Sequence, residues 1–194
     1  LSRGGEGWLP LRGLLPALAD DALAYAPLVF HALGLAEWLF VTRFCPRCAG
    51  ALEPRRAGHE LVCSQCGKPQ FPRTDPAVIM LVHRGERCVL AHNRRNPNKM
   101  YSTLAGFLEP GESIEEAVAR EVLEEVGITI GKVRYHSSQP WPFPASIMVG
   151  FMAKAASREI KIDDKELEYA RWYGRDWLRN VEDSDEFRMP GKYS

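Results

Sequence analysis

The most regular pattern of apolar and polar positions in the chain lies between Ser113 and Gly127. Apolar residues recur there at the three- and four-residue spacing of one helix face, at Ile114, Ala117, Val118 and Val122. Pro110 and Gly111 favour a turn just before this segment. Ser113 and Glu116 match a capping box, and Gly127 is a typical C-terminal stop. The pattern predicts a short amphipathic helix.

The polar side of this predicted helix carries three glutamates. Glu121 and Glu125 lie four residues apart on one face, and Glu124 lies beside them. Because like charges at such positions repel, the arrangement calls for cations, and carboxylate oxygens favour magnesium or manganese. Such ions bridge phosphate oxygens and lower the pKa of an attacking water. A solvated acidic face is the alternative, but the capping box, the preceding glycine loop and Arg120 favour a site that hydrolyses pyrophosphates.

Shorter apolar runs elsewhere in the chain predict strands. The runs cover Ala77–His83, Arg87–Ala91, Lys132–Ser137, Ile147–Ala153 and Tyr169–Tyr173. A turn at residues 84–86 separates the first two, and a loop rich in Asn and Arg is expected from His92 to Lys99. Together with the glutamate helix, these strands predict an α/β fold with a mixed sheet flanked by helices.

The segment Ala22–Val41 is predominantly apolar and predicts a helix. Pro27, His31 and Glu37 interrupt the apolar run, so packing against protein is favoured over the alternative of a transmembrane span. The first forty residues contain no complete fold. We therefore expect residues 1–42 to be the C-terminal part of an N-terminal domain together with a linking helix.

Four of the five cysteines form two C-x2-C pairs. They are Cys45, Cys48, Cys63 and Cys66, with fourteen residues between the pairs. Four thiolates at this spacing predict a zinc ribbon over residues 43–71, with a structural role because no ligand position is left for water. The alternative is two disulfides, but a two-residue gap seldom suits a structural disulfide. The fifth cysteine, Cys88, lies in an apolar run and is predicted to be a packed strand residue.

Composition favours a soluble, cytoplasmic enzyme with one catalytic domain and smaller attachments. The 194 residues are 45% hydrophobic, which is enough to bury a sizeable core. Twenty-five basic and 25 acidic residues give a formal net charge of zero. A large basic field that would hold nucleic acid non-specifically is therefore not expected, and any RNA substrate would be recognised at one end.

The stretch from Gly106 to Ile128 resembles the signature of the Nudix hydrolases, G-x5-E-x7-R-E-U-x-E-E-x-G-U with U aliphatic, and every fixed position is present. The resemblance implies an α/β/α sandwich for residues 72–194. It also implies that the catalytic magnesium or manganese is held by Glu121, Glu124, Glu125 and the main-chain carbonyl of Ala105. Glu112 and Arg120 correspond to the pair that holds the glycine loop against the helix.

A loop with three prolines at alternate positions follows the predicted helix. It covers residues 138–146, in which Ser138 is followed by Gln139, Pro140, Trp141, Pro142, Phe143, Pro144, Ala145 and Ser146. From the residues alone, it predicts a rigid surface turn with packed aromatics. The run also resembles the mark of the NADH pyrophosphatase family, in which the whole segment contacts the substrate. A zinc ribbon directly before a Nudix domain resembles the arrangement of the same family.

This resemblance implies a metal-dependent hydrolase that splits NADH and NAD+ into nicotinamide mononucleotide and AMP, with a glutamate of the metal-binding set as general base. The resemblance also implies removal of NAD caps from RNA 5′ ends, because that reaction cuts the same bond. One alternative is a Nudix pyrophosphatase for ADP-ribose or another dinucleotide, against which the proline loop argues. The other is a non-enzymatic nucleotide- or RNA-binding protein that uses the zinc ribbon as its binding module. Retention of every motif glutamate argues against that.

A further metal ligand is expected in the acidic stretch near residues 163–168, for which a solvated loop is the ordinary interpretation. In the resembled family, an acidic residue before the late tryptophan strand completes the metal site. Alignment on Trp172 and Tyr173 selects Glu166 for this role, with Glu168 as the nearest competitor.

Two aromatic residues and one arginine complete the expected substrate site. Phe71 and Phe107 match family positions that stack the adenine, an interaction of about 1–3 kcal/mol per base. In that family the two rings come from different subunits, which implies a homodimer; from sequence alone, core residues are the alternative. Arg12 resembles a substrate-contacting arginine near the domain junction. The family has a larger N-terminal domain and a further C-terminal helix, so both ends of the sequence are expected to be trimmed.

Overall fold

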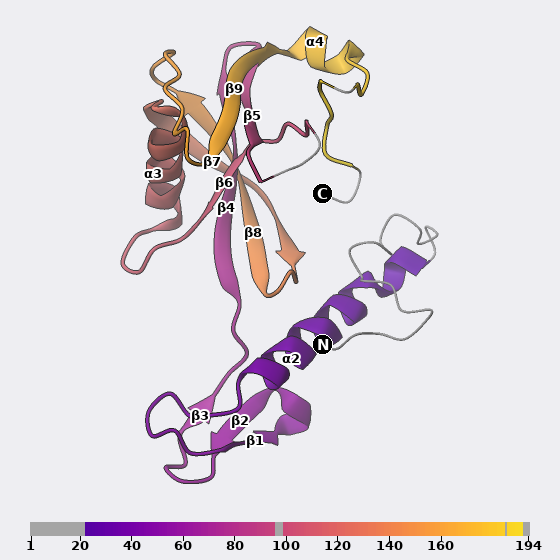
Figure 1. Cartoon of the computed structure of the whole chain (residues 1–194), viewed down its shortest axis with the longest axis vertical. Helices are drawn as coiled ribbons and strands as arrows, with labels where there is room; N and C mark the ends of the chain where they lie inside the picture. The colour runs from indigo at the N-terminus through magenta and orange to yellow at the C-terminus, as the bar shows by residue number, and fades with distance from the viewer. Residues whose placement is uncertain (1–21, 96–98, 185, 192–194) are drawn as a thin grey trace. The chain divides into compact units, whose positions relative to one another are not determined.

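The computed structural model describes residues 22–95, 99–184 and 186–191 (Figure 1). Arg12, which the sequence singled out as a substrate contact, lies outside the described residues. The chain divides into two compact units. The first comprises the residues up to Asp75 together with Pro140–Ile147, and the second comprises Pro76–Gln139 and the residues from Met148 onward.

A six-stranded mixed sheet forms the centre of the second unit. Its strands are β4 (Asp75–Arg84), β5 (Arg87–Asn93), β6 (Leu104–Phe107), β7 (Ile130–Trp141), β8 (Ser146–Ala155) and β9 (Leu167–Gly174). The order is β7-β8-β4-β5-β9, with β6 paired to β4. Strand β4 runs antiparallel to β5 and β6, and β5 runs antiparallel to β9. All five predicted strands are present, whereas the four-residue β6 was too short to leave a pattern.

Helix α3 (Ile114–Val126) confirms the strongest prediction from the sequence. The Ser113 hydroxyl accepts a hydrogen bond from the Glu116 amide, and the Glu116 carboxylate accepts one from the Ser113 amide at 2.8 Å. Gly127 ends the helix in the left-handed conformation at φ 66°, which glycine adopts without steric cost, and its amide donates to the Leu123 carbonyl.

The main core lies between α3 and one face of the sheet, where Figure 1 shows the helix. Val118 and Val122 of α3 pack against alternate residues of β4, namely Val78, Met80 and Val82, all fully buried. Side chains on a strand alternate between its two faces, so these three residues share the α3 face. Burying each such side chain stabilises the fold by about 1.5–3 kcal/mol.

The opposite face of the sheet carries a smaller aromatic core. Tyr101 and Phe187 stack with ring centroids 4.8 Å apart, beside the buried side chains of Cys88 and Leu90. The short helix α4 (Arg175–Asn180) contributes Leu178 to this cluster. Helices therefore pack on both sides of the sheet, as expected, although α4 adds only Leu178 and its six residues were too few to show a helical period. Cys88 is buried in β5, as predicted, and burial raises the pKa of its thiol.

A three-stranded antiparallel sheet lies in the first unit, within the region predicted to be a zinc ribbon. Its strands are β1 (Leu52–Arg55), β2 (Glu60–Cys63) and β3 (Pro69–Gln70), in the order β1-β2-β3. The predicted helix before it is present as a 3-10 turn, η2 (Ala22–Tyr25), followed by α2 (Ala26–Val41), while a second 3-10 turn, η3 (Arg56–Gly58), follows β1. Among the described residues, no helix combines the length and the apolar character that a membrane crossing requires.

Two expectations about loops need correction. The loop predicted from His92 begins later, because β5 continues to Asn93 and His92 is buried within it. The rigid turn predicted over residues 138–146 is also shorter, since β7 extends to Trp141 and β8 begins at Ser146. Pro140 therefore lies inside a strand, where its missing amide is tolerated because β7 is the edge strand of the sheet.

Candidate active site and metal centre

Arg120 connects the glycine loop to helix α3. Its guanidinium makes a two-pronged ion pair with Glu112, at 2.7 and 3.0 Å, and also donates to the Phe107 carbonyl at 2.9 Å. Glu112 accepts a further hydrogen bond from the Glu109 amide at 2.7 Å. The hydrogen bonds from Arg120 and from this amide hold the pKa of Glu112 below its usual value. The loop and the helix are thus joined by charge-assisted hydrogen bonds, which are stronger than neutral ones.

Glu121 packs directly against the glycine of the signature. A Cβ atom at position 106 would collide with the Glu121 carboxylate, so any other residue there would displace this carboxylate from its place. Gly106 pairs with Val78 of β4, which fixes the carboxylate at the junction of helix and sheet. Burial raises the pKa of Glu121 despite a hydrogen bond at 2.8 Å from Arg120.

Glu125 is the most unusual carboxylate in the described part of the chain. Its side chain is buried, with 7% of the residue exposed, and its Oε2 atom has no hydrogen-bond partner among the described residues. Burial first, and then the charges of Glu121, Glu166 and Glu124, raise its pKa to about 8. A buried carboxylate without a partner is costly, and a bound cation would compensate for it.

The structure separates the two candidates for the additional acidic ligand. Glu166 lies just before β9, and its charge raises the pKa of both Glu121 and Glu125. Glu168 is instead engaged elsewhere, because its carboxylate lies 3.3 Å from His92 Nε2 and 3.5 Å from Lys99 Nζ. Glu166 is therefore the better placed of the two to join the helix carboxylates.

A cavity of about 290 Å³ lies beside these groups in the second unit. Glu125 and Ala105 both line it, so the structure brings the predicted carbonyl ligand to the same space as the buried carboxylate. Asn93, Arg95 and Ser102 add polar groups to its wall. An unpartnered carboxylate oxygen at the same cavity as a carbonyl, with the charges of Glu121, Glu166 and Glu124 close enough to raise its pKa, suits a hard divalent cation. The residues thus fit a divalent metal site.

The four predicted zinc ligands converge in the first unit. All four sulfur atoms lie within 4.8 Å of one another, with Cys45 and Cys66 sulfurs 3.8 Å apart and Cys48 and Cys63 sulfurs 3.5 Å apart. These distances rule out the disulfide alternative, whose S–S bond is about 2.05 Å. A tetrahedral zinc with Zn–S bonds of about 2.3 Å separates its sulfurs by about 3.8 Å.

Main-chain amides prepare one of these thiols for a metal. The amides of Cys66 and Gln65 both donate to Cys63 Sγ at 3.4 Å. The hydrogen bond from Cys66, followed by that from Gln65, lowers the pKa of Cys63 to about 6. The four-cysteine site thus fits a structural zinc closed by protein ligands.

The proline loop forms part of the wall of a second cavity, of about 440 Å³, within the first unit. Pro140, Pro142, Ala145 and Ser146 line it together with Arg73. Within the loop, the Trp141 and Phe143 rings meet edge to face at 5.2 Å, as the packed-aromatic prediction anticipated. The Ala145 carbonyl accepts a hydrogen bond from the Asp75 amide at 2.7 Å. The peptide bond that precedes Pro144 is cis. Gln139 belongs to strand β7.

Phe71 and Phe107 are both strongly exposed, at 64% and 59% of their surface. The alternative that they are core residues is therefore wrong for this chain. Phe71 belongs to the first unit and Phe107 to the second.

Sequence reasoning missed the contacts that surround the predicted catalytic groups. The contact of the buried His92 ring with the Glu168 carboxylate was hidden because His92 was expected in a loop. The close approach of Gly106 to the Glu121 carboxylate was also not predictable, because the sequence shows only that a glycine is present.

Family models match both parts of the chain that carry these sites. The NUDIX domain model matches residues 73–189, and the model of the NADH pyrophosphatase zinc ribbon domain matches residues 42–71. The protein is therefore a member of the Nudix hydrolase family with a zinc ribbon before the catalytic domain. A crystal structure of a NUDIX hydrolase from Nitrosomonas europaea has the same fold, with a TM-score of 0.59 at 20% identity over 70% of this chain and 79% of that one.

Curated relatives are similar to most of this chain at about 40% identity. Nudix hydrolase 19, chloroplastic, of Arabidopsis thaliana is 44% identical over 88% of this chain and 40% of its own length. NAD-capped RNA hydrolase NUDT12 of Homo sapiens is 41% identical over 86% of this chain and 38% of its length. NAD-capped RNA hydrolase NudC of Citrobacter koseri is 39% identical over 90% of this chain and 70% of its length. The chain thus spans less than half the length of the first two relatives.

Proposed function

We propose that this protein hydrolyses the pyrophosphate bond of NADH and NAD+, giving nicotinamide mononucleotide and AMP. The observation that carries the proposal is the buried Glu125, whose unpartnered oxygen lies at a cavity beside further carboxylates in a Nudix fold. A dinucleotide is the favoured substrate because the zinc ribbon matches that of NADH pyrophosphatases and two of the relatives cited above are named NAD-capped RNA hydrolases.

Magnesium or manganese is the proposed catalytic metal. Its ligands would be Glu121, Glu124, Glu125, Glu166 and the Ala105 carbonyl. When bound, such ions neutralise charge on the phosphates and promote ionisation of the attacking water. Oxygen ligands favour these two metals over softer ones.

The chain's own residues would hold this arrangement and accept the proton of the water. Arg120 and Glu112 hold the end of β6, the strand that carries the Ala105 carbonyl, and the loop after it against the helix. One glutamate of the metal-binding set acts as general base.

The proline loop from Gln139 to Ser146 is proposed to contact the dinucleotide. The cavity that four of its residues line, together with the guanidinium of Arg73, offers a rigid wall beside a cation, which suits a nucleotide with a charged phosphate. Removal of an NAD cap from an RNA 5′ end is the same reaction on a longer substrate, since the same bond is cut.

A homodimer is proposed to complete the adenine site. The exposure of both Phe71 and Phe107 leaves two large aromatic faces available, and a base held between two rings gains stacking energy from each. We also place the protein in the cytoplasm, where a reducing environment keeps the four zinc ligands as thiols.

Product analysis tests the proposed reaction. The protein is incubated with NADH, NAD+ and ADP-ribose in parallel, with magnesium or manganese, and the products are separated by chromatography. The proposal expects AMP and reduced nicotinamide mononucleotide from NADH, with slower cleavage of ADP-ribose. Faster turnover of ADP-ribose would favour that alternative substrate, and three intact compounds would favour a binding protein.

A further inference from the structure

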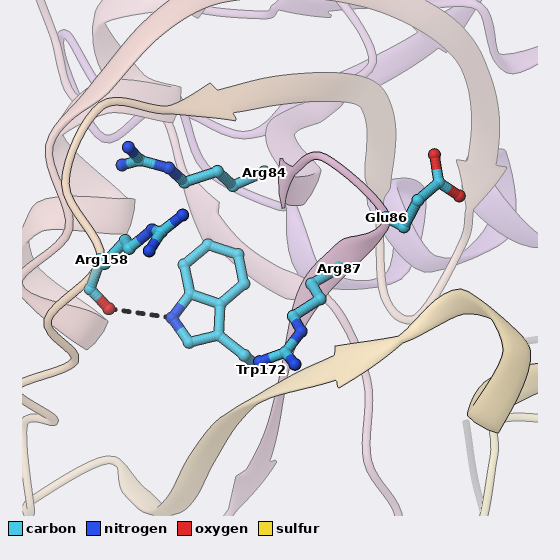
Figure 2. A pocket seen from close by; sticks show the side chains of 5 residues that line it. All are labelled: Arg84, Glu86, Arg87, Arg158 and Trp172. Atoms are coloured by element: carbon cyan, nitrogen blue, oxygen red, sulfur yellow. Dashed lines mark hydrogen bonds between the residues drawn. The ribbon is translucent and has the colours of Figure 1, made fainter.

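A second cavity in the catalytic unit lies away from the carboxylates. It has a volume of about 470 Å³ and is lined by Arg84, Glu86, Arg87, Arg158 and Trp172. This size falls within the range of roughly 300–1,000 Å³ that is typical of small-molecule sites and is larger than a single small anion needs. Figure 2 shows the three arginines around the Trp172 indole, with the Glu86 carboxylate turned away from it.

Strand geometry places this cavity on the same face of the sheet as α3. Arg84 continues the alternating series Val78, Met80 and Val82 on β4, and Arg87 begins the series that continues with Val89 on β5. The row of apolar side chains that packs under α3 therefore continues into an arginine on each of the strands β4 and β5.

The cavity is separate from the carboxylate site. Gly106, against which Glu121 packs, pairs with Val78 of β4. Arg84 follows six residues later, which corresponds to about 20 Å along a strand. The two cavities share none of their lining residues. A ligand here would therefore not occupy the place of the reacting phosphates.

The charges around the cavity are unbalanced. Glu86 is bound by Arg175, with its carboxylate 2.7 Å from the Arg175 Nε atom. Within the described residues, no carboxylate pairs with Arg84, Arg87 or Arg158. Among the residues that the structure describes, Arg84 makes a single side-chain hydrogen bond, from its Nη1 to the Ala156 carbonyl at 3.0 Å, which positions the side chain and leaves other N–H groups available. In a protein with zero formal net charge, three unpaired guanidinium groups at one cavity favour an anion.

The tryptophan adds an aromatic surface in a fixed orientation. The indole N–H of Trp172 donates to the Arg158 carbonyl at 2.9 Å, so the ring is tied to the loop that also presents the Arg158 guanidinium (Figure 2). The ring is half-buried against the core and lines the cavity. A fixed aromatic ring beside arginines suits a ligand with both a planar base and a phosphate.

We propose that the Arg84–Arg87–Arg158–Trp172 cavity binds a nucleoside 5′-phosphate, with the phosphate held by the arginines and the base against Trp172. The nucleotide is either free or a unit of single-stranded RNA, and the chemistry of recognition is the same for both. This site does not depend on the dinucleotide reaction, because it is defined by a separate cavity.

The test uses the indole N–H resonance of Trp172 as a local reporter. Proton–nitrogen NMR spectra of the 194-residue protein are recorded, and the resonance is assigned by its loss in Trp172→Phe. AMP, a 5′-phosphorylated oligoribonucleotide, adenosine and inorganic phosphate are then titrated separately. We expect AMP or the oligonucleotide to shift the resonance to saturation, with adenosine and phosphate at least about tenfold weaker.

Arginine variants decide whether the cavity is responsible. The double variant Arg87→Ala/Arg158→Ala removes two exposed side chains and should weaken the response at least about tenfold. Arg134→Ala, which removes an exposed arginine from edge strand β7, should leave it unchanged, and NADH hydrolysis should be unaffected in both. A response to the oligonucleotide alone assigns the site to RNA, whereas an equal response to AMP assigns it to free nucleotides.

Three results would overturn the proposal. They are the absence of a shift with either nucleotide, an unchanged response in the double variant, and a response to inorganic phosphate as strong as that to AMP.

Discussion

At the scale of single residues, Glu125 combines burial, like-charged neighbours and an unpartnered oxygen. In the unfolded chain its pKa is near the ordinary value of 4.5, whereas in the folded, metal-free protein it is about 8. The folded state therefore binds more protons between these values, so the stability that Glu125 contributes is complete below pH 4.5 and is lost as the pH rises towards 8.

Replacing Glu125 should remove this pH dependence. In metal-free protein, Glu125→Gln is expected to be more stable than the native chain at pH 8 by on the order of a few kcal/mol, and to show little advantage at pH 4.5, because a pKa difference of one corresponds to about 1.4 kcal/mol. Urea unfolding at both pH values measures this. Glu115→Gln, an exposed position of the same helix, should show no such trend, and an equal trend in both variants would contradict the account.

Glu112 tests the connection between loop and helix. Glu112→Gln should lower the free energy of unfolding clearly more than a change at an exposed loop position does, because it weakens the charge-assisted pair with Arg120. Glu109→Gln provides a matched control at an exposed loop position and should change stability by less than about 0.5 kcal/mol. Equal losses in the two variants would show that the pair contributes nothing specific.

At the scale of secondary-structure elements, the cap of α3 is the clearest local determinant. Ser113→Ala should destabilise the protein by about 1 kcal/mol, since the Glu116 amide and carboxylate lose their partner hydroxyl. Ser113→Thr keeps a hydroxyl and should recover most of the loss. Chemical denaturation of the three proteins measures both effects, and a Thr variant as unstable as the Ala variant would argue against capping as the cause.

Helix α3 was predictable because its signals are local. The apolar spacing, the capping box and Gly127 each act within a few residues, and all agree. The strands were recognised from their apolar runs, but β6 and α4 are too short to carry a period. The ends of the proline loop were misplaced because a proline in an edge strand breaks no sheet hydrogen bond.

The site was predictable only as far as its signature extends. The motif gave the helix glutamates, and alignment on the family pattern selected Glu166 over Glu168. Only the contacts of Glu168 with His92 and Lys99 in space show that its carboxylate is engaged elsewhere. The arginines of the cavity beside Trp172 lie on β4, on β5 and in the loop after β8. Their convergence on this ring follows only from the fold.

At the scale of the whole molecule, zinc should support the first unit. Metal analysis is expected to find one zinc per chain, lost in Cys63→Ser, with a lowered melting temperature, because four converging thiols without metal leave the ribbon without its main cross-link. Cys88→Ser changes a buried cysteine outside the cluster and should retain the zinc. Loss of zinc from that variant would contradict the assignment.

The central claim is that the carboxylates around Glu125 hydrolyse a dinucleotide pyrophosphate. The most direct measurement is the kcat for AMP formation from NADH in the native protein, in Glu125→Gln and in Glu168→Gln, at saturating magnesium or manganese. We predict a loss of at least about 100-fold for Glu125→Gln and a much smaller change for Glu168→Gln, whose carboxylate is bound to His92 and Lys99. Equal rates in the native protein and Glu125→Gln would contradict the claim.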